Sequence, residues 1–164
     1  MDEKGDGVIV RLLAEADLPR LIQIDQRITG RNRTLWYERK LKRALEETDI
    51  RISLGAEHDG ALIGAILGFL LYGEYGQPEP LAVIDTILVD PMFAGRGAGT
   101  ALLDQLLRNL RALGIERLRT EVGWDEHDLS RFLGARGFAP IPRLVLEIKV
   151  ESPPDREEFI GDPR

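Results

Sequence analysis

The segment best suited to chemistry is a glycine-rich turn that joins an apolar run to a leucine-rich stretch. It reads Gly95-Arg96-Gly97-Ala98-Gly99-Thr100, with glycine at every second position. Glycine has no Cβ, so a phosphate group can approach the backbone closely there. If a helix begins at this turn, its first N–H groups lack intrahelical partners and attract anions. The turn therefore predicts a site for a phosphate-bearing ligand.

Two well-known phosphate-binding turns can be compared with this one. A P-loop is excluded, because it needs a lysine after its last glycine and none is present. A dinucleotide-binding turn reads G-x-G-x-x-G directly after a strand, whereas here the third glycine comes one position early, at Gly99, and residues 90–94 intervene. That alternative stays open, since Glu121 lies at a suitable distance to bind a ribose. A turn that serves only helix packing is a further alternative.

The hydrophobic pattern predicts the elements that must position this turn, in the order β-α-α-β-β-β-α-β-α-β. The expected strands are Val8–Leu13, Arg51–Glu57, Ala61–Tyr72, Leu81–Val89, Glu116–Val122 and Arg143–Val150. Asp59-Gly60 predicts a hairpin between the second and third strands. The leucine-rich helix predicts a parallel crossover between the fourth and fifth. We therefore expect an α/β fold, with a mixed, mostly antiparallel sheet of six to seven strands and helices on both faces.

Composition excludes several classes of protein. The 164 residues suit one domain, which we place at residues 1–150, followed by a mobile tail over 151–164. A net charge of −6 argues against general nucleic-acid binding. The absence of cysteine and the presence of only two histidines argue against a metal site. No apolar run reaches the roughly 20 residues that span a bilayer, and residues 1–7 do not resemble a signal peptide. We expect a cytoplasmic protein.

A longer pattern surrounds the glycine turn. The segment Val89–Leu103 reads VDPMFAGRGAGTALL. It closely resembles the acetyl-CoA-binding motif of the GNAT superfamily of N-acetyltransferases, V-x-P-x-x-(R/Q)-G-x-G-x-G-(S/T)-x-L-L. Farther along, Leu129, Phe132 and the pair Gly137-Phe138 are similar to the family's later helix. The order of strands and helices also matches, so the resemblance predicts a GNAT-like fold over almost the whole chain.

The resemblance implies which residues bind the cofactor, acetyl-CoA, with its pyrophosphate at the glycine turn. The expected cofactor-binding residues are Leu88, Val89, Gly95, Arg96, Gly97, Ala98, Gly99, Thr100, Leu129 and Phe132. It also implies that a backbone N–H at a strand bulge near Leu88 polarises the thioester carbonyl. Two positions depart from the family. Ala94 replaces the usual Arg or Gln, and Leu133 stands where many members carry a tyrosine that protonates the departing thiolate.

Two carboxylates inside expected strands are candidates for the base that this chemistry needs. Glu121 is the first candidate, because it lies 17 residues before Phe138, like a glutamate of bacterial members that acetylate protein N-termini. Asp85 is the second, because it lies on the strand before the glycine turn. A buried carboxylate with a raised pKa would suit the role. The alternative for each is a strand-end charge that bonds a neighbouring loop.

Three aromatic side chains are candidates for the substrate-binding wall. Tyr72 and Tyr75 lie near the hairpin end that, by resemblance, borders the acceptor site, and one of them could replace the missing acid. Trp124 follows its strand and could line the cleft or fill the core.

The resemblance implies transfer of the acetyl group from acetyl-CoA to a primary amine of a small molecule or a peptide, by direct attack and without a metal. One alternative is a regulatory module that binds acyl-CoA without transferring it, because the usual tyrosine is missing. Another is a nicotinamide-dependent dehydrogenase. A homodimer is also expected, because Arg143–Val150 could expose a sheet edge that a second copy would pair with.

Overall fold

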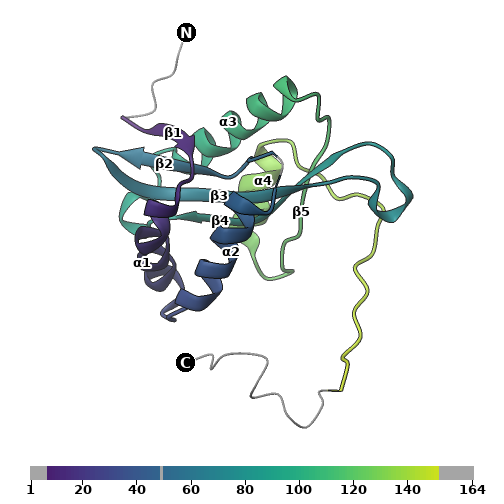
Figure 1. The fold of residues 1–164 in the computed structure, drawn as a ribbon, viewed down its shortest axis with the longest axis horizontal. Coiled ribbons are helices and arrows are strands. Elements are labelled where there is room, and N and C mark those ends of the chain that lie inside the picture. The colour runs from purple at the N-terminus through teal and green to yellow at the C-terminus, as the bar shows by residue number, and fades with distance from the viewer. Residues whose placement is uncertain (1–6, 49, 152–164) are drawn as a thin grey trace. The chain divides into compact units, whose positions relative to one another are not determined.

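A computed structural model describes residues 7–48 and 50–151 of the chain (Figure 1). This part contains five strands and four α-helices, which confirms a mixed α/β fold. In chain order they are β1 (Ile9–Leu12), α1 (Leu18–Thr29), α2 (Thr34–Glu46), β2 (Leu54–His58), β3 (Ala61–Leu71), β4 (Leu81–Val89), α3 (Ala98–Ala112), β5 (Leu118–Thr120) and α4 (His127–Ala135). The chain divides into two compact units, the first ending at Glu121 and the second beginning at Val122.

The five strands of the first unit form one mixed sheet in the order β1-β2-β3-β4-β5. Neighbours are antiparallel from β1 to β4, whereas β4 and β5 are parallel. The predicted hairpin is confirmed: Asp59 and Gly60 both have positive φ, of 48° and 78°, as the tight turns that match strand twist require. The predicted parallel pair is confirmed too, with α3 as the crossover between its strands.

Helices cover both faces of this sheet, as expected (Figure 1). On one face, α1 and α2 pack their apolar sides on β3 and β4, and the side chains of Leu21, Ile24, Tyr37 and Leu41 are buried there. On the other face, α3 contacts β2, β3 and β4 through its leucine stripe. The sheet thus lies between two layers of helices, and β4 contacts helices of both layers. None of the helices in the described ranges has the length and apolar content needed to cross a bilayer.

The expected count of six to seven strands is wrong for the described residues. Arg143–Val150, the expected last strand, is irregular and exposed in the second unit. Its alternating apolar residues fit the two-residue period of a strand, but a strand forms only when a neighbour completes its hydrogen bonds. No such neighbour is present in the described chain. The expected homodimer therefore stays a prediction. The expected mobile tail lies, from residue 152 onward, outside the described residues.

Candidate active site

The glycine turn follows β4 after residues 90–94 and leads into α3, as the sequence predicted. Gly95 and Gly97 have positive φ, of 77° and 79°, a conformation that side chains disfavour. A Cβ at either glycine would meet no atom within 4 Å, so the outer side of the turn is open. Gly97 is the N-cap of α3 and provides no side-chain cap, and the first turn of α3 carries no acidic residue. The turn therefore presents a positive helix end to an anion.

A buried carboxylate, which the sequence reasoning missed, fixes the start of this turn. Asp90, directly after β4, is fully buried and accepts hydrogen bonds from Arg20 (2.7 Å) and Arg27 (2.6 Å), both on α1. It also accepts a hydrogen bond from the backbone N–H of Met92 (3.0 Å). Three donors thus tie α1 and the turn to the end of β4. The signal in the sequence was an acidic residue between Val89 and a proline.

The bulge of β4 is at Asp85 and not near Leu88, where we expected it. Leu67 of β3 pairs with Thr86 and its neighbour Gly68 pairs with Ile84, so Asp85 has no partner on β3. At Leu88 the pairing is regular. Gly68 explains the position, because a Cβ there would lie 2.5 Å from the backbone oxygen of Val83. Only glycine permits this close approach of the strands.

The pairing of β4 with β5 also stops beside the bulge. Its last pair is Ile84–Thr120, and the Thr120 hydroxyl donates to the Ile84 carbonyl (2.9 Å). β4 continues to Val89, and within residues 7–48 and 50–151 its edge from Asp85 onward pairs with no strand on the β5 side. Unpaired backbone N–H and C=O groups along a strand can bind an extended ligand. This free edge leads from the bulge to the glycine turn.

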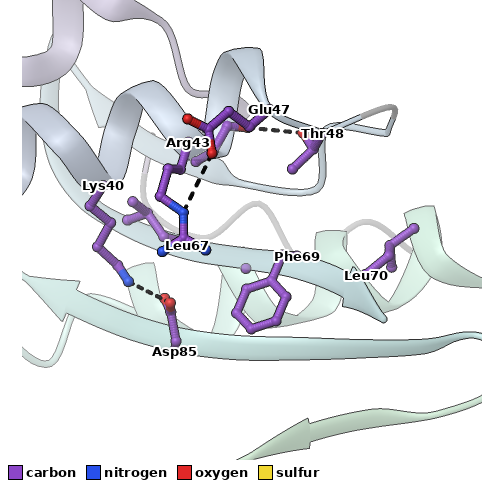
Figure 2. A pocket seen from close by; sticks show the side chains of 10 residues that line it. Lys40, Arg43, Glu47, Thr48, Leu67, Phe69, Leu70 and Asp85 are labelled. Carbon is purple, nitrogen blue, oxygen red and sulfur yellow. Dashed lines mark hydrogen bonds and ion pairs between the residues drawn. The ribbon is translucent and has the colours of Figure 1, made fainter. Parts of the chain in front are cut away.

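A cavity of about 380 Å³ opens at the bulge, between α2 and the strands β3 and β4 (Figure 2). Its lining residues are Lys40, Arg43, Ala44, Glu47, Thr48, Leu67, Gly68, Phe69, Leu70 and Asp85. The side chains of Asp85 and Lys40 point toward each other across the cavity and form an ion pair. The Asp85 carboxylate also accepts a hydrogen bond from the Thr86 hydroxyl (3.1 Å). A carboxylate therefore reaches the cavity beside the bulge.

Neither of the two candidate bases is the buried carboxylate that would suit the role best. The Asp85 side chain is 36% exposed, because the bulge turns it toward the cavity. Glu121 is exposed and follows β5, which ends at Thr120. The apolar pattern suggested a strand through Glu121, but the pairing with β4 ends one residue earlier. Of the two, only Asp85 lines the cavity.

The remaining predicted site residues divide between the two units. In the first, Tyr72 and Tyr75 are exposed beyond β3, and Tyr75 has a positive φ of 54°. In the second, Trp124 is fully exposed, so its alternative role as core filler is wrong. Leu129 and Phe132 are half-buried on α4. The wall and cofactor roles expected of all five side chains stay predictions.

Comparison with known proteins shows the family to which the chain belongs. The sequence matches the acetyltransferase (GNAT) family over residues 18–138, which include the turn, the bulge and α4. The chain belongs to the acetyltransferase (GNAT) family. This membership favours acetyl-CoA over a dinucleotide as the ligand of the turn. No curated protein sequence matches the chain significantly.

Solved structures share the fold at low sequence identity. An aminoglycoside N-acetyltransferase in complex with CoA is 18% identical, with a TM-score of 0.74, and the match covers 91% of this chain and 99% of that one. A ribosomal-protein-alanine N-acetyltransferase from Brucella melitensis biovar Abortus 2308 is 21% identical, with a TM-score of 0.68 and coverage of 88% and 99%. A transcriptional regulator from Bacillus halodurans C-125 is 17% identical, with a TM-score of 0.72 and coverage of 87% and 99%. At these identities the likeness shows the GNAT fold and no particular substrate.

Proposed function

We propose that this GNAT protein is an N-acetyltransferase that moves the acetyl group of acetyl-CoA to a primary amine. The observation that carries the proposal is the continuous path along β4. The open glycine turn lies at one end, the free strand edge follows, and the bulge with its cavity lies at the other end. A substrate with phosphate groups and a long polar chain needs an anion site followed by a strand edge that can hydrogen-bond the chain. A second substrate needs a cavity at the end of that edge.

The residues present fit coenzyme A in its chemistry. The amides at the start of α3 suit the pyrophosphate, because a helix N-terminus attracts negative charge. Arg96 is exposed and stacks over Phe93 (5.4 Å from its guanidinium carbon to the ring centre), so a cation lies beside the turn. The backbone of Leu88 and Val89 lies on the free edge of β4. When bound, acetyl-CoA supplies the activated acetyl group.

The acceptor amine belongs, in this proposal, in the cavity below α2, with Asp85 as its base. A carboxylate at the bulge can bind an ammonium ion and accept its proton, directly or through water. Sequence reasoning placed Glu121 first in this role and Asp85 second. We reverse this order, because Asp85 lines the cavity and Glu121 does not. The amine that has lost its proton is then the nucleophile.

Calorimetric titration with coenzyme A tests the cofactor site. Gly97→Val places a branched side chain over the phosphate path, and we expect affinity to fall at least about tenfold, the scale of one charge-assisted hydrogen bond. Gly114→Val is the matched control, because Gly114 ends the same helix with a similar φ of 72° and equally open surroundings. Equal affinities of two folded variants would remove the assignment.

A module that binds acyl-CoA and regulates without transfer is the second candidate. Leu133 in place of the family's tyrosine favours it. Release of free thiol from acetyl-CoA in the presence of a panel of amines separates the two. Thiol release that depends on an amine supports the transferase. Tight binding of CoA without release for any amine supports the module.

A further inference from the structure

The cavity between α2 and the strands β3 and β4 is lined by two basic side chains, two acidic side chains and several apolar ones. Lys40 and Arg43 approach it from α2, and each already has an acidic partner: Asp85 for Lys40, and Glu47 for Arg43 at 3.7 Å (Figure 2). Phe69 and Leu67 of β3 form an apolar part of the lining. A cationic ligand therefore finds no carboxylate here that is without a basic partner.

Lys40 is the most constrained of these charges. Its side chain is only 18% exposed, whereas that of Lys42, two positions along the same helix, is 66% exposed. Its ammonium lies 4.9 Å from the centre of the Trp36 ring, a cation–π contact that holds the side chain over the cavity. Among the described residues, Asp85 is the only acidic partner within ion-pair distance of Lys40. A charge that is mostly shielded from water gains more from an anionic partner than a fully exposed charge does.

This arrangement limits which amines can bind, if the acceptor site is the one proposed above. An acceptor amine reaches Asp85 as an ammonium ion and competes with Lys40 for the carboxylate. A simple amine would leave two cations beside one carboxylate and Lys40 without a partner. An acceptor with its own anionic group restores the balance, because its ammonium pairs with Asp85 and its anion pairs with Lys40. Arg43, one helical turn along, offers a second cation to the same anion.

We propose that the acceptor is a small amphoteric amine, whose ammonium binds Asp85 and whose carboxylate or phosphate binds Lys40 and Arg43. The volume of about 380 Å³ is near the lower end of the usual range for small-molecule pockets and suits an acceptor of this size. The floor of Phe69 and Leu67 accommodates an apolar body between or beside the two charged groups. A polycationic acceptor such as an aminoglycoside is disfavoured, because Asp85 and Glu47 already have basic partners and each further ammonium would have to displace one of them.

Matched acceptor pairs test this substrate class by the rate of thiol release. Phenylalanine and phenylalaninamide share the amine and the ring and differ in the carboxylate. Phosphoethanolamine and ethanolamine differ in the phosphate, so the two pairs separate the two kinds of anion. We expect kcat/KM to be about tenfold or more higher for the anionic member of at least one pair, and higher than for the aminoglycoside sisomicin. Equal or better use of the neutral member in both pairs, or of sisomicin, overturns the proposal.

Substitutions on α2 test whether the preference arises where we place it. Lys40→Met should abolish the preference, so that kcat/KM becomes about equal for the two members of a pair. Arg43→Gln, at an exposed position that tolerates change, should lower the ratio of the two kcat/KM values about threefold. Lys42→Met and Arg39→Gln are the controls, because both side chains lie outside the cavity lining, and they should leave the preference unchanged. An unchanged preference in both Lys40→Met and Arg43→Gln overturns the assignment.

A binding measurement separates failure of this inference from failure of the proposed function. The same pairs are titrated calorimetrically into the protein saturated with CoA. Selective binding of an anionic member without thiol release supports the amphoteric site and contradicts the transferase. Thiol release without charge preference supports the transferase and contradicts the amphoteric site.

Discussion

Two carboxylates at β4 have opposite surroundings, although both are held by basic side chains from helices. Asp90 is fully buried, with two arginines of α1 and one backbone N–H as its donors. Asp85 is 36% exposed at the bulge and pairs with a single lysine of α2 beside a cavity. A carboxylate enclosed by three donors has no room for a ligand, whereas one at a cavity with a single basic partner can exchange that partner. Asp90 therefore supports the site, and Asp85 can take part in it.

The largest effect on stability should come from Asp90→Ala. The change leaves Arg20 and Arg27 without their shared carboxylate at the edge of the core. We expect the free energy of unfolding, measured in urea, to fall by about 3 kcal/mol, the lower end for a broken buried pair because both arginines are partly exposed. Glu79→Ala, which breaks an exposed pair with Arg117, should cost less than about 1 kcal/mol. Equal losses in the two variants would contradict a scaffold role for Asp90.

The largest effect on turnover should come from Asp85→Asn, which keeps the shape of the side chain and removes its basic form. We expect kcat to fall about 10²-fold, the usual scale for a positioned base, while the Michaelis constant for acetyl-CoA stays nearly unchanged. The deficit should shrink at high pH, where free amine is abundant. Stability should change by less than about 1 kcal/mol, since the pair is partly exposed.

Glu121→Gln is the companion variant, and we expect near-normal turnover from pH 6 to 9. Its side chain is exposed beyond the end of β5 and lines none of the cavity at the bulge. If Glu121→Gln loses activity while Asp85→Asn keeps it, the order first suggested by the sequence is restored. If both variants work normally, the amine loses its proton to water and neither carboxylate is the base.

The comparison of the surroundings of Asp90 and Asp85 also shows what could be predicted from the sequence. In the proposed function the glycine turn acts through its backbone, and glycine spacing after an apolar strand is the sequence signal for such a turn. Even there, the acidic residue between Val89 and a proline did not show that Asp90 would bind two arginines some 60 to 70 positions earlier in the chain. Contacts between distant segments depend on how the helices pack on the sheet, and local periodicity does not encode this packing.

The cavity at the bulge was much harder to predict, because residues from α2, β3 and β4 meet only in the folded chain. The bulge was expected near Leu88 and lies at Asp85, and the cause is Gly68 on the neighbouring strand. Its signal was a glycine inside an apolar run, which often marks a bulge or a close backbone approach. The expected strand Glu116–Val122 is longer than β5 for a related reason: apolar residues do not show where strand pairing stops.

The smallest effect concerns a third carboxylate, Asp25 on α1, which is buried but lies away from β4. Hydrogen bonds from Arg33 hold the pKa of Asp25 below its ordinary value of 3.8, against the opposing effect of burial, and the Tyr37 hydroxyl adds a further hydrogen bond of 3.0 Å. Because the pKa is lower in the folded state, the unfolded chain binds more protons at acid pH. The resulting stability is fully present well above pH 3.8 and is lost as the pH falls through that value toward the lower folded pKa.

We expect the unfolding free energy of the wild-type protein to decline between pH 5 and 3, and that of Asp25→Asn to start lower and decline less. Asp128→Asn, at a side chain that is 99% exposed, should follow the wild-type curve. Parallel curves for wild type and Asp25→Asn would contradict this expectation. They would show that the charge of Asp25 does not contribute to the stability of the fold.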